Sequence, residues 1–106
     1  MRYMIEWAIR TAGLTHEQNL ANLEALQNAF GKWKPEEGLT VHAFLATVHG
    51  HSGYVLVEAS DPKVVTSFVT KFGYWNDINV VPMIDVGEAV AISAANIVWA
   101  RAASKS

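Results

Sequence analysis

The amino-acid sequence predicts an α+β fold of the ferredoxin-like type, with a four-stranded antiparallel sheet, two helices on one of its faces and an additional C-terminal helix. Three observations lead to this prediction. Apolar residues alternate with a period of two in the first segment, further β-rich runs follow along the chain, and apolar residues recur at helical spacing in three segments, which gives the order β-α-β-β-α-β-α. Capping signals precede the first two helical segments, and a glycine-bounded tetrad separates the second and third strands. We expect residues 1–106 to form one domain.

The first strand is predicted over residues 2–10, where every second residue is apolar: Tyr3, Ile5, Trp7 and Ile9. The first helix is predicted over residues 15–30. Thr15 and Gln18 have the spacing of a capping box, and Gly31 is a typical residue at a helix end. Four apolar residues recur between them at helical spacing: Leu20, Leu23, Leu26 and Phe30.

The second and third strands are predicted over residues 39–48 and 54–59, joined as a hairpin by a turn that contains Gly50 and Gly53. Asp61 and Pro62 then start the second helix, which ends at Gly73. The fourth strand is predicted over residues 78–85, and the last helix over residues 87–103. This last helix is apolar around most of its circumference, which is typical of a helix packed between layers or between chains.

Both faces of the predicted sheet are apolar. In the second strand His42 and Phe44 share one face with other apolar residues, while Val41, Ala43 and Leu45 lie on the opposite face. A sheet with one solvated face would instead alternate apolar and polar residues. Because two helices cover only one face, we expect a second copy of the chain to cover the other, so that the protein is a homodimer.

Composition excludes several classes of protein. Hydrophobic residues make up 51% of the chain and charged residues 17%, which excludes disorder. The net charge of −2 lacks the basic excess of a nucleic-acid-binding protein, so no nucleic-acid partner is expected. The absence of cysteine excludes disulfides, thiolate zinc sites and thiol nucleophiles. No segment has the pattern of a signal peptide or a membrane span, so we expect a cytoplasmic protein with no membrane partner.

The candidate ligand-binding residues are mostly aromatic. Four tryptophans in 106 residues is a high number, and their polar ring nitrogens suit a pocket or an interface better than a dry core. His42 is a candidate polar group in such a pocket, although a satisfied core histidine is the plainer interpretation. The predicted set is Trp7, His42, Phe44, Tyr54, Trp75 and Met83. No cofactor is expected, and no catalytic residue is assigned.

Two further groups could carry chemistry. His49 and His51, with Glu58 as a third ligand, could hold a metal ion, but a solvated turn is the favoured interpretation and no metal is expected. Glu6 and Glu58 lie on strands that are neighbours in this topology and could share a proton. Ion pairs with Arg or Lys near a dimer interface are the favoured role for both.

The chain resembles the dimeric α/β-barrel superfamily, and within it a bacterial family of short domains of unknown function. The resemblance lies in the element order, in Trp7, in residues 53–59 (GYVLVEA) followed by Asp61 and Pro62, and in residues 80–82 (VVP). It implies a homodimer whose two sheets form a barrel, with a small-molecule cavity between sheet and helices in each subunit. The superfamily includes cofactor-free monooxygenases, polyketide cyclases, lactone isomerases and haem enzymes, so the resemblance implies no particular catalytic residue.

The leading hypothesis is therefore a homodimer that binds an apolar small molecule, fatty-acyl-like or aromatic, with one polar end. A competing hypothesis is a cofactor-independent cyclase, isomerase or monooxygenase that uses His42 or a nearby glutamate as a proton carrier. A third is a structural dimer without a site.

Overall fold

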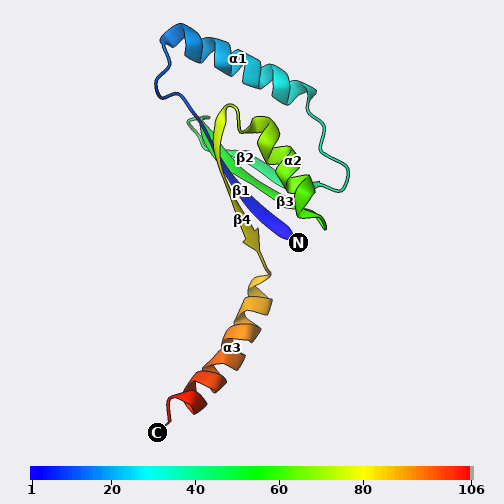
Figure 1. Ribbon diagram of the computed structural model, residues 1–106, viewed down its shortest axis with the longest axis vertical. Coiled ribbons are helices and arrows are strands. Elements are labelled where there is room, and N and C mark those ends of the chain that lie inside the picture. The colour runs from blue at the N-terminus through cyan, green and yellow to red at the C-terminus, as the bar shows by residue number, and fades with distance from the viewer. Residues whose placement is uncertain (106) are drawn as a thin grey trace.

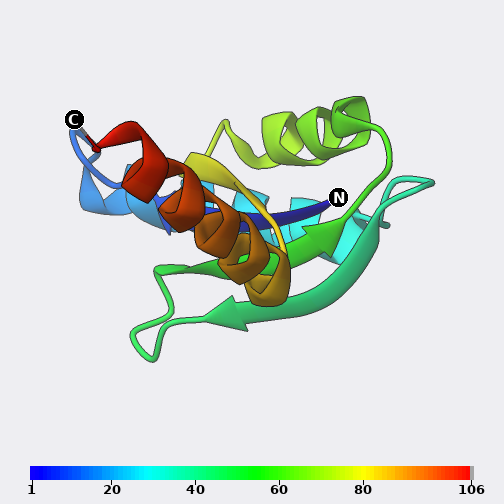
Figure 2. The ribbon, with the colours of Figure 1, turned by 90° about the horizontal axis from the view of Figure 1, so that it is seen from below.

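Four strands form one antiparallel sheet in the computed structural model, which describes residues 1–105 (Figure 1). Strands β1 (Arg2–Ile9), β2 (Thr40–Ala46), β3 (Ser52–Glu58) and β4 (Asn76–Met83) lie in the order β2-β3-β1-β4. The chain order β-α-β-β-α-β-α and this antiparallel sheet confirm the predicted ferredoxin-like α+β arrangement. Seen from below, α2 and the β2–β3 hairpin lie at opposite sides of β1 (Figure 2).

Helices α1 (His16–Lys32) and α2 (Pro62–Phe72) begin at the predicted caps. Thr15 Oγ1 accepts from the backbone N–H of Gln18, and Gln18 Oε1 accepts from that of Thr15, which completes the capping box. Asp61 Oδ1 accepts from the backbone N–H of Lys63 at 2.9 Å. Helix α1 continues two residues beyond the predicted end and includes Gly31, because a glycine inside a helix costs only about 1 kcal/mol.

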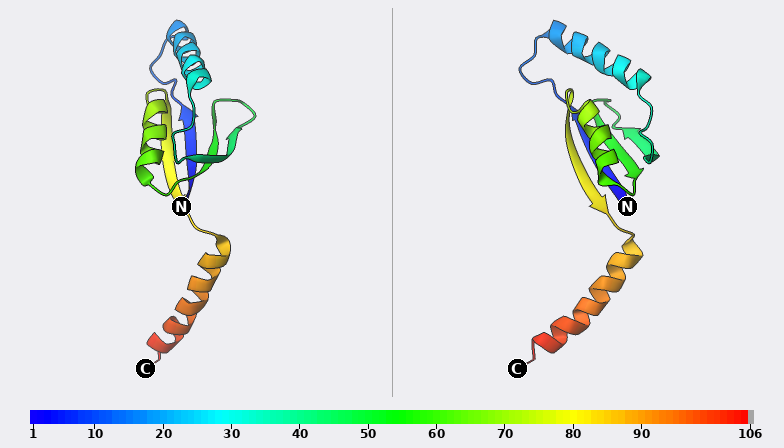
Figure 3. Two further views of the ribbon diagram at one scale, coloured as in Figure 1. Left: turned by 90° about the vertical axis from the view of Figure 1, so that its right-hand side faces the viewer. Right: turned by 45° about the vertical axis from the view of Figure 1, so that its right-hand side comes forward.

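The core lies between the sheet and α2. Ile5, Val55 and Val57 of the two central strands are almost completely buried, and α2 contributes Val65 and Phe68 to the same cluster. Helix α1 lies farther out, beyond the end of the sheet where β1 ends (Figures 1 and 3). Within the described residues, α1 contributes no buried side chain. The two helices therefore cover the sheet unequally, which leaves space between α1 and the sheet.

A β-bulge in β2 corrects one prediction from the sequence. Val41 lies opposite Val57, but the register shifts before Ala43, which lies opposite Leu56. His42 is the extra residue, so His42 and Phe44 lie on opposite faces of the sheet and not on the same face. The prediction failed because one inserted residue reverses the facing of all residues on one side of it.

The face of the sheet away from the helices is open. Its middle is an apolar row that crosses all four strands, formed by Ala43, Leu56, Met4 and Val81 in neighbouring register positions. We call this row, together with the exposed Leu45 and Tyr54 beside it, the open face. No other element of residues 1–105 covers it in the views of Figure 3.

Helix α3 (Val86–Ala103) extends away from the rest of the chain (Figures 1 and 3). As a result the chain measures 67 Å along its longest axis and 23 Å along its shortest. All described α3 residues are exposed, including Trp99 at 70%. None of the helices in residues 1–105 is long and apolar enough to cross a membrane.

Candidate functional site

A cavity of about 360 Å³ lies between the helix-facing side of the sheet, α2 and the C-terminal half of α1. Each of the four strands contributes to its wall. Most of the lining is aliphatic or aromatic: Ile5, Trp7, Ile9, Leu26, Phe30, Phe44, Ala46, Val55, Phe68, Val69, Phe72 and Ile78. Gln27 and Asn76 are the other two lining residues, so within residues 1–105 no charged side chain lines the cavity. Such a surface is suited to an apolar molecule.

Five aromatic side chains line the cavity and contact one another. Phe30 of α1 and Phe44 of β2 meet edge to face with ring centroids 5.4 Å apart. Phe30 also lies 6.3 Å from Phe72, and Phe44 lies 6.4 Å from both Trp7 and Phe68. Phe30 is 47% exposed and Phe44 37%, so this part of the wall is not closed by protein. Packing against an apolar ligand would remove these exposed rings from water.

The position of Trp7 depends on a glycine. Trp7 pairs with Gly53 across β1 and β3, and its indole ring lies directly against that residue. A Cβ at position 53 would lie 2.5 Å from Trp7 Cζ2. The absence of a side chain at Gly53 therefore lets the edge of the indole ring approach the backbone of β3 closely.

Two buried polar atoms of cavity-lining residues lack hydrogen-bond partners within the described part of the chain. Trp7 Nε1 is a buried donor without an acceptor, and Asn76 Oδ1 is a buried acceptor without a donor. Asn76 is only 6% exposed, and its Nδ2 donates to the Phe72 carbonyl at 3.0 Å. Buried polar atoms are nearly always paired in folded proteins, so these two are exceptions in the packing between the sheet and α2.

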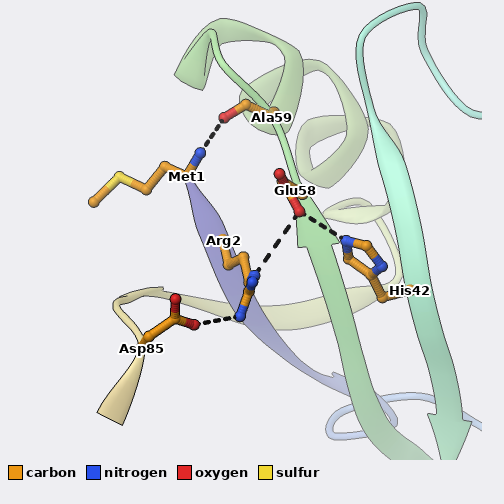
Figure 4. A network of polar contacts seen from close by, with 6 residues as sticks. All are labelled: Met1, Arg2, His42, Glu58, Ala59 and Asp85. Atoms are coloured by element: carbon orange, nitrogen blue, oxygen red, sulfur yellow. Dashed lines mark hydrogen bonds and ion pairs between the residues drawn. The ribbon is translucent and has the colours of Figure 1, made fainter. Parts of the chain in front are cut away.

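A cluster of charged and polar side chains lies on the side of the sheet opposite the cavity (Figure 4). His42 Nε2 lies 2.9 Å from Glu58 Oε1, and Arg2 Nε lies 3.8 Å from the same oxygen. Arg2 Nη1 also donates to Asp85 Oδ1 at 2.6 Å, at the start of α3. The hydrogen bond from His42 holds the pKa of the Glu58 carboxyl below its ordinary value, and the positive charge of Arg2 acts in the same direction.

The chain matches one known protein family. A family model described as a domain of unknown function (DUF3303) matches residues 1–97. The chain belongs to this family. The match extends through the four strands and far into α3, so α3 is part of the family's domain. A comparison with curated proteins finds no match.

The structure places the six candidate ligand-binding residues at three locations. Trp7 and Phe44 line the cavity. Trp75 lines a smaller pocket of about 200 Å³, which adjoins the cavity through the shared residues Ile9 and Leu26. The other three lie on the opposite side of the sheet or at its bulge: His42, Tyr54 and Met83.

Sequence reasoning did not select three important residues of the cavity wall. Phe30 was assigned only to the apolar positions of the first helix, Phe72 lies at the predicted end of the second helix, and Asn76 lies between that helix and the predicted fourth strand. Both phenylalanines lie in the last turn or two of a helix, at the same end of the sheet. That shared position is the sequence signal that could have indicated a common site.

The structure does not assemble the two alternative sites considered from the sequence, the metal site of His49, His51 and Glu58 and the pair of Glu6 and Glu58. The His49 and His51 rings stack with centroids 5.8 Å apart in the hairpin turn, at the far end of β3 from Glu58. Glu6 lies opposite Tyr54 and accepts from Asn79 Nδ2 at 3.3 Å, whereas Glu58 lies opposite Arg2. Among residues 1–105 no group of three His, Asp or Glu side chains is arranged to hold a metal ion.

The lowered pKa of Glu58 predicts a dependence of stability on pH. Because the carboxyl binds its proton more weakly in the folded protein, ionised Glu58 stabilises the fold above the ordinary carboxyl pKa. This contribution is lost as the pH falls through the lower pKa of the folded state. We expect the melting temperature of Glu58→Gln to fall less between pH 6 and pH 3 than that of the wild type, by circular dichroism. Glu24→Gln, on the exposed part of α1, is the control. Equal acid sensitivity of Glu58→Gln and the wild type would contradict the prediction.

Proposed function

We propose that this protein binds an apolar small molecule, aromatic or fatty-acyl-like, in the cavity between the sheet and the two helices. The observation that carries the proposal is the cavity itself, about 360 Å³ in volume and lined almost entirely by apolar and aromatic side chains. This volume is within the range of small-molecule sites, roughly 300–1,000 Å³. Folded cores are packed almost without voids, so an opening of this size is better explained as a site than as an imperfect core.

The arrangement of α1 supports the same function. The helix carries an apolar stripe toward the cavity, yet Phe30 stays 47% exposed and none of the described α1 side chains is buried. A bound apolar molecule would fill the space between α1 and the sheet and would bury this stripe. The ligand would then hold α1 in position and would increase the free energy of unfolding of the protein.

An enzymatic function that uses His42 or Glu58 has less support. The two side chains contact each other beside the open face, and the cavity lies on the helix-facing side of the sheet. A proton carried by this pair would therefore be separated from a ligand in the cavity by the sheet itself. General acid–base catalysis requires hydrogen-bond reach to the reacting atom or to one bridging water.

A homodimer is part of the proposal. The apolar row of the open face and the exposed apolar residues of α3 are the surfaces that a second copy would cover. Two such sheets packed face to face would form the barrel that the resemblance to dimeric α/β-barrel proteins implies. The cavities would then lie on the outer sides of the paired sheets, one in each subunit.

The binding function is tested with N-phenyl-1-naphthylamine, an uncharged dye whose fluorescence rises in apolar surroundings. We expect saturable binding to the native full-length protein at one dye per chain. Ala46→Trp, which places a large side chain at the cavity wall, should weaken binding at least tenfold. Ala21→Trp, on the exposed surface of α1, is the matched control and should bind like the wild type. No saturable binding, or equal binding by Ala46→Trp, would contradict the proposed function.

The same hypothesis predicts different costs for two phenylalanine truncations. Phe68 is 4% exposed and stacks on Trp33 at 4.8 Å, so Phe68→Ala should lower the free energy of unfolding by about 3–5 kcal/mol. Phe44 borders a space that already exists, so Phe44→Ala should cost clearly less while weakening dye binding. Urea denaturation measures both costs, and equal costs would indicate that Phe44 belongs to a packed core.

A further inference from the structure

A second, smaller pocket adjoins the cavity and differs from it in polarity. The inference drawn from it rests on the proposed function, because it concerns the polar end of the molecule bound in the cavity. The smaller pocket has a volume of about 200 Å³ and shares Ile9 and Leu26 with the cavity wall, so the two spaces lie side by side. A molecule that extends beyond the cavity on this side would therefore enter the smaller pocket.

The smaller pocket carries a positive charge. Among the described residues that line either space, Arg10 is the one with a charged side chain. Asn22 and Tyr74 add an amide and a hydroxyl to the same wall. Because the larger cavity is apolar, the two spaces together match an amphiphilic molecule that has an apolar body and an anionic end.

Arg10 is held at the pocket by bonds at both of its ends. It directly follows the last residue of β1, and its backbone N–H donates to the Trp75 carbonyl at 2.9 Å. Its Nη2 donates to the Gly73 carbonyl at the end of α2. The side chain nevertheless stays about half exposed, so a ligand can reach it. A guanidinium has five N–H donors, so the bond to Gly73 leaves others free for an anion.

The acidic neighbour of Arg10 is a weak competitor for this anion. Arg10 Nη1 lies 3.5 Å from Asp77 Oδ1, and the Asp77 side chain is largely exposed to solvent. Exposed ion pairs of this kind contribute little, because water screens the charges and both side chains lose freedom. A carboxylate that accepts two N–H bonds from one edge of the guanidinium would have the better geometry and would displace Asp77.

We infer that the ligand is an amphiphilic monocarboxylate, such as a fatty acid, whose apolar chain lies in the cavity and whose carboxylate binds Arg10. One guanidinium matches the single negative charge of a carboxylate. A phosphate monoester would bring about two negative charges to the same arginine, and one of them would stay without a partner. An amine would be repelled by Arg10, and an alcohol would not supply the anionic partner.

Three compounds with the same ten-carbon chain test the inference on the full-length protein at pH 7.5: decanoate, decylammonium and 1-decanol. Their dissociation constants are measured by displacement of N-phenyl-1-naphthylamine, at concentrations below those at which the compounds aggregate. Decanoate and decylammonium carry opposite charges of equal size, so both lose their hydration on binding. We expect decanoate to bind at least about tenfold more tightly than decylammonium, because it alone gains an ion pair with Arg10.

Three variants connect this preference to the pocket. Arg10→Gln should weaken the binding of decanoate about tenfold and that of 1-decanol much less. Asp77→Asn keeps Arg10 and removes its competitor, so it should tighten the binding of decanoate at least about twofold. Arg101→Gln removes the same charge from the exposed surface of α3, outside both pockets, and should bind decanoate like the wild type.

The location of the chain and the folding of the variants have their own controls. Ala46→Trp should weaken the binding of decanoate as it weakens that of the dye, because the chain and the dye occupy the same cavity. If Arg10→Gln does not fold, Asp77→Asn decides the question, since this change leaves the bond between Arg10 and Gly73 in place.

The outcomes separate this inference from the proposed function. Saturable binding of the dye would leave the proposed function in place, while any one of three results would overturn the inference. These are equal binding of decanoate and decylammonium, unchanged binding of decanoate by both Arg10→Gln and Asp77→Asn, and unchanged binding of decanoate by Ala46→Trp. If neither the dye nor any of the three compounds binds, both the inference and the proposed function are wrong.

Discussion

Gly53→Ala should lower the free energy of unfolding by about 3 kcal/mol or more, because no space exists for a side chain at this position. An added Cβ would overlap the backbone oxygen of Leu45 on β2 and would lie 2.5 Å from Trp7 Cζ2. A backbone oxygen in a paired strand does not move alone, so β2 would have to separate from β3. In a chain of this size, this loss of free energy should lower the melting temperature by about 12 °C or more.

The matched control is Gly31, one of the two glycines that the sequence analysis placed at a helix end. Gly31 lies inside α1, where an added Cβ would contact nothing within 4 Å. Gly31→Ala should therefore stabilise the protein by about 0.5–1 kcal/mol, since alanine loses less conformational freedom in a helix. Urea denaturation of both variants measures the difference. A Gly53→Ala variant as stable as the wild type would contradict the close approach of Trp7, Gly53 and β2.

The order and type of the elements could be predicted because each depends on local signals. The capping box at Thr15, the Asp61–Pro62 start of α2 and the alternation in β1 act within a few residues, and the structure retains all three. The end of α1 could not be predicted from Gly31, because the cost of one glycine is smaller than the gain from continuing the helix.

The candidate site was only partly predictable because it depends on register. Trp7 and Phe44 were chosen as aromatic residues of neighbouring parts of the sheet, and both line the cavity. His42 was grouped with Phe44 by simple alternation, which the bulge after Val41 reverses. A bulge leaves no composition signal, so a sequence pattern with period two cannot reveal it. Asn76 was missed because its buried, unpaired oxygen is a feature that only the three-dimensional arrangement shows.

The largest effect on assembly is expected from a charge in the middle of the open face. Leu56 lies between Ala43 and Met4 in the apolar row, so in the proposed homodimer its side chain would pack against the partner sheet. Leu56→Glu would bury a carboxylate without a partner, which disfavours association by several kcal/mol. The dissociation constant of the dimer should therefore increase at least about 100-fold.

Sedimentation equilibrium of the full-length protein measures this effect. The wild type should have about twice the mass of the 11.6 kDa chain at micromolar concentration, and Leu56→Glu should have the mass of one chain. Thr66→Glu places the same charge on the exposed surface of α2 and should leave the dimer intact. A monomeric wild type, or a Leu56→Glu variant that associates like the wild type, would contradict the dimer. Because the cavity faces away from the open face, a monomeric Leu56→Glu variant that stays folded should still bind N-phenyl-1-naphthylamine, so assembly and ligand binding can be tested separately.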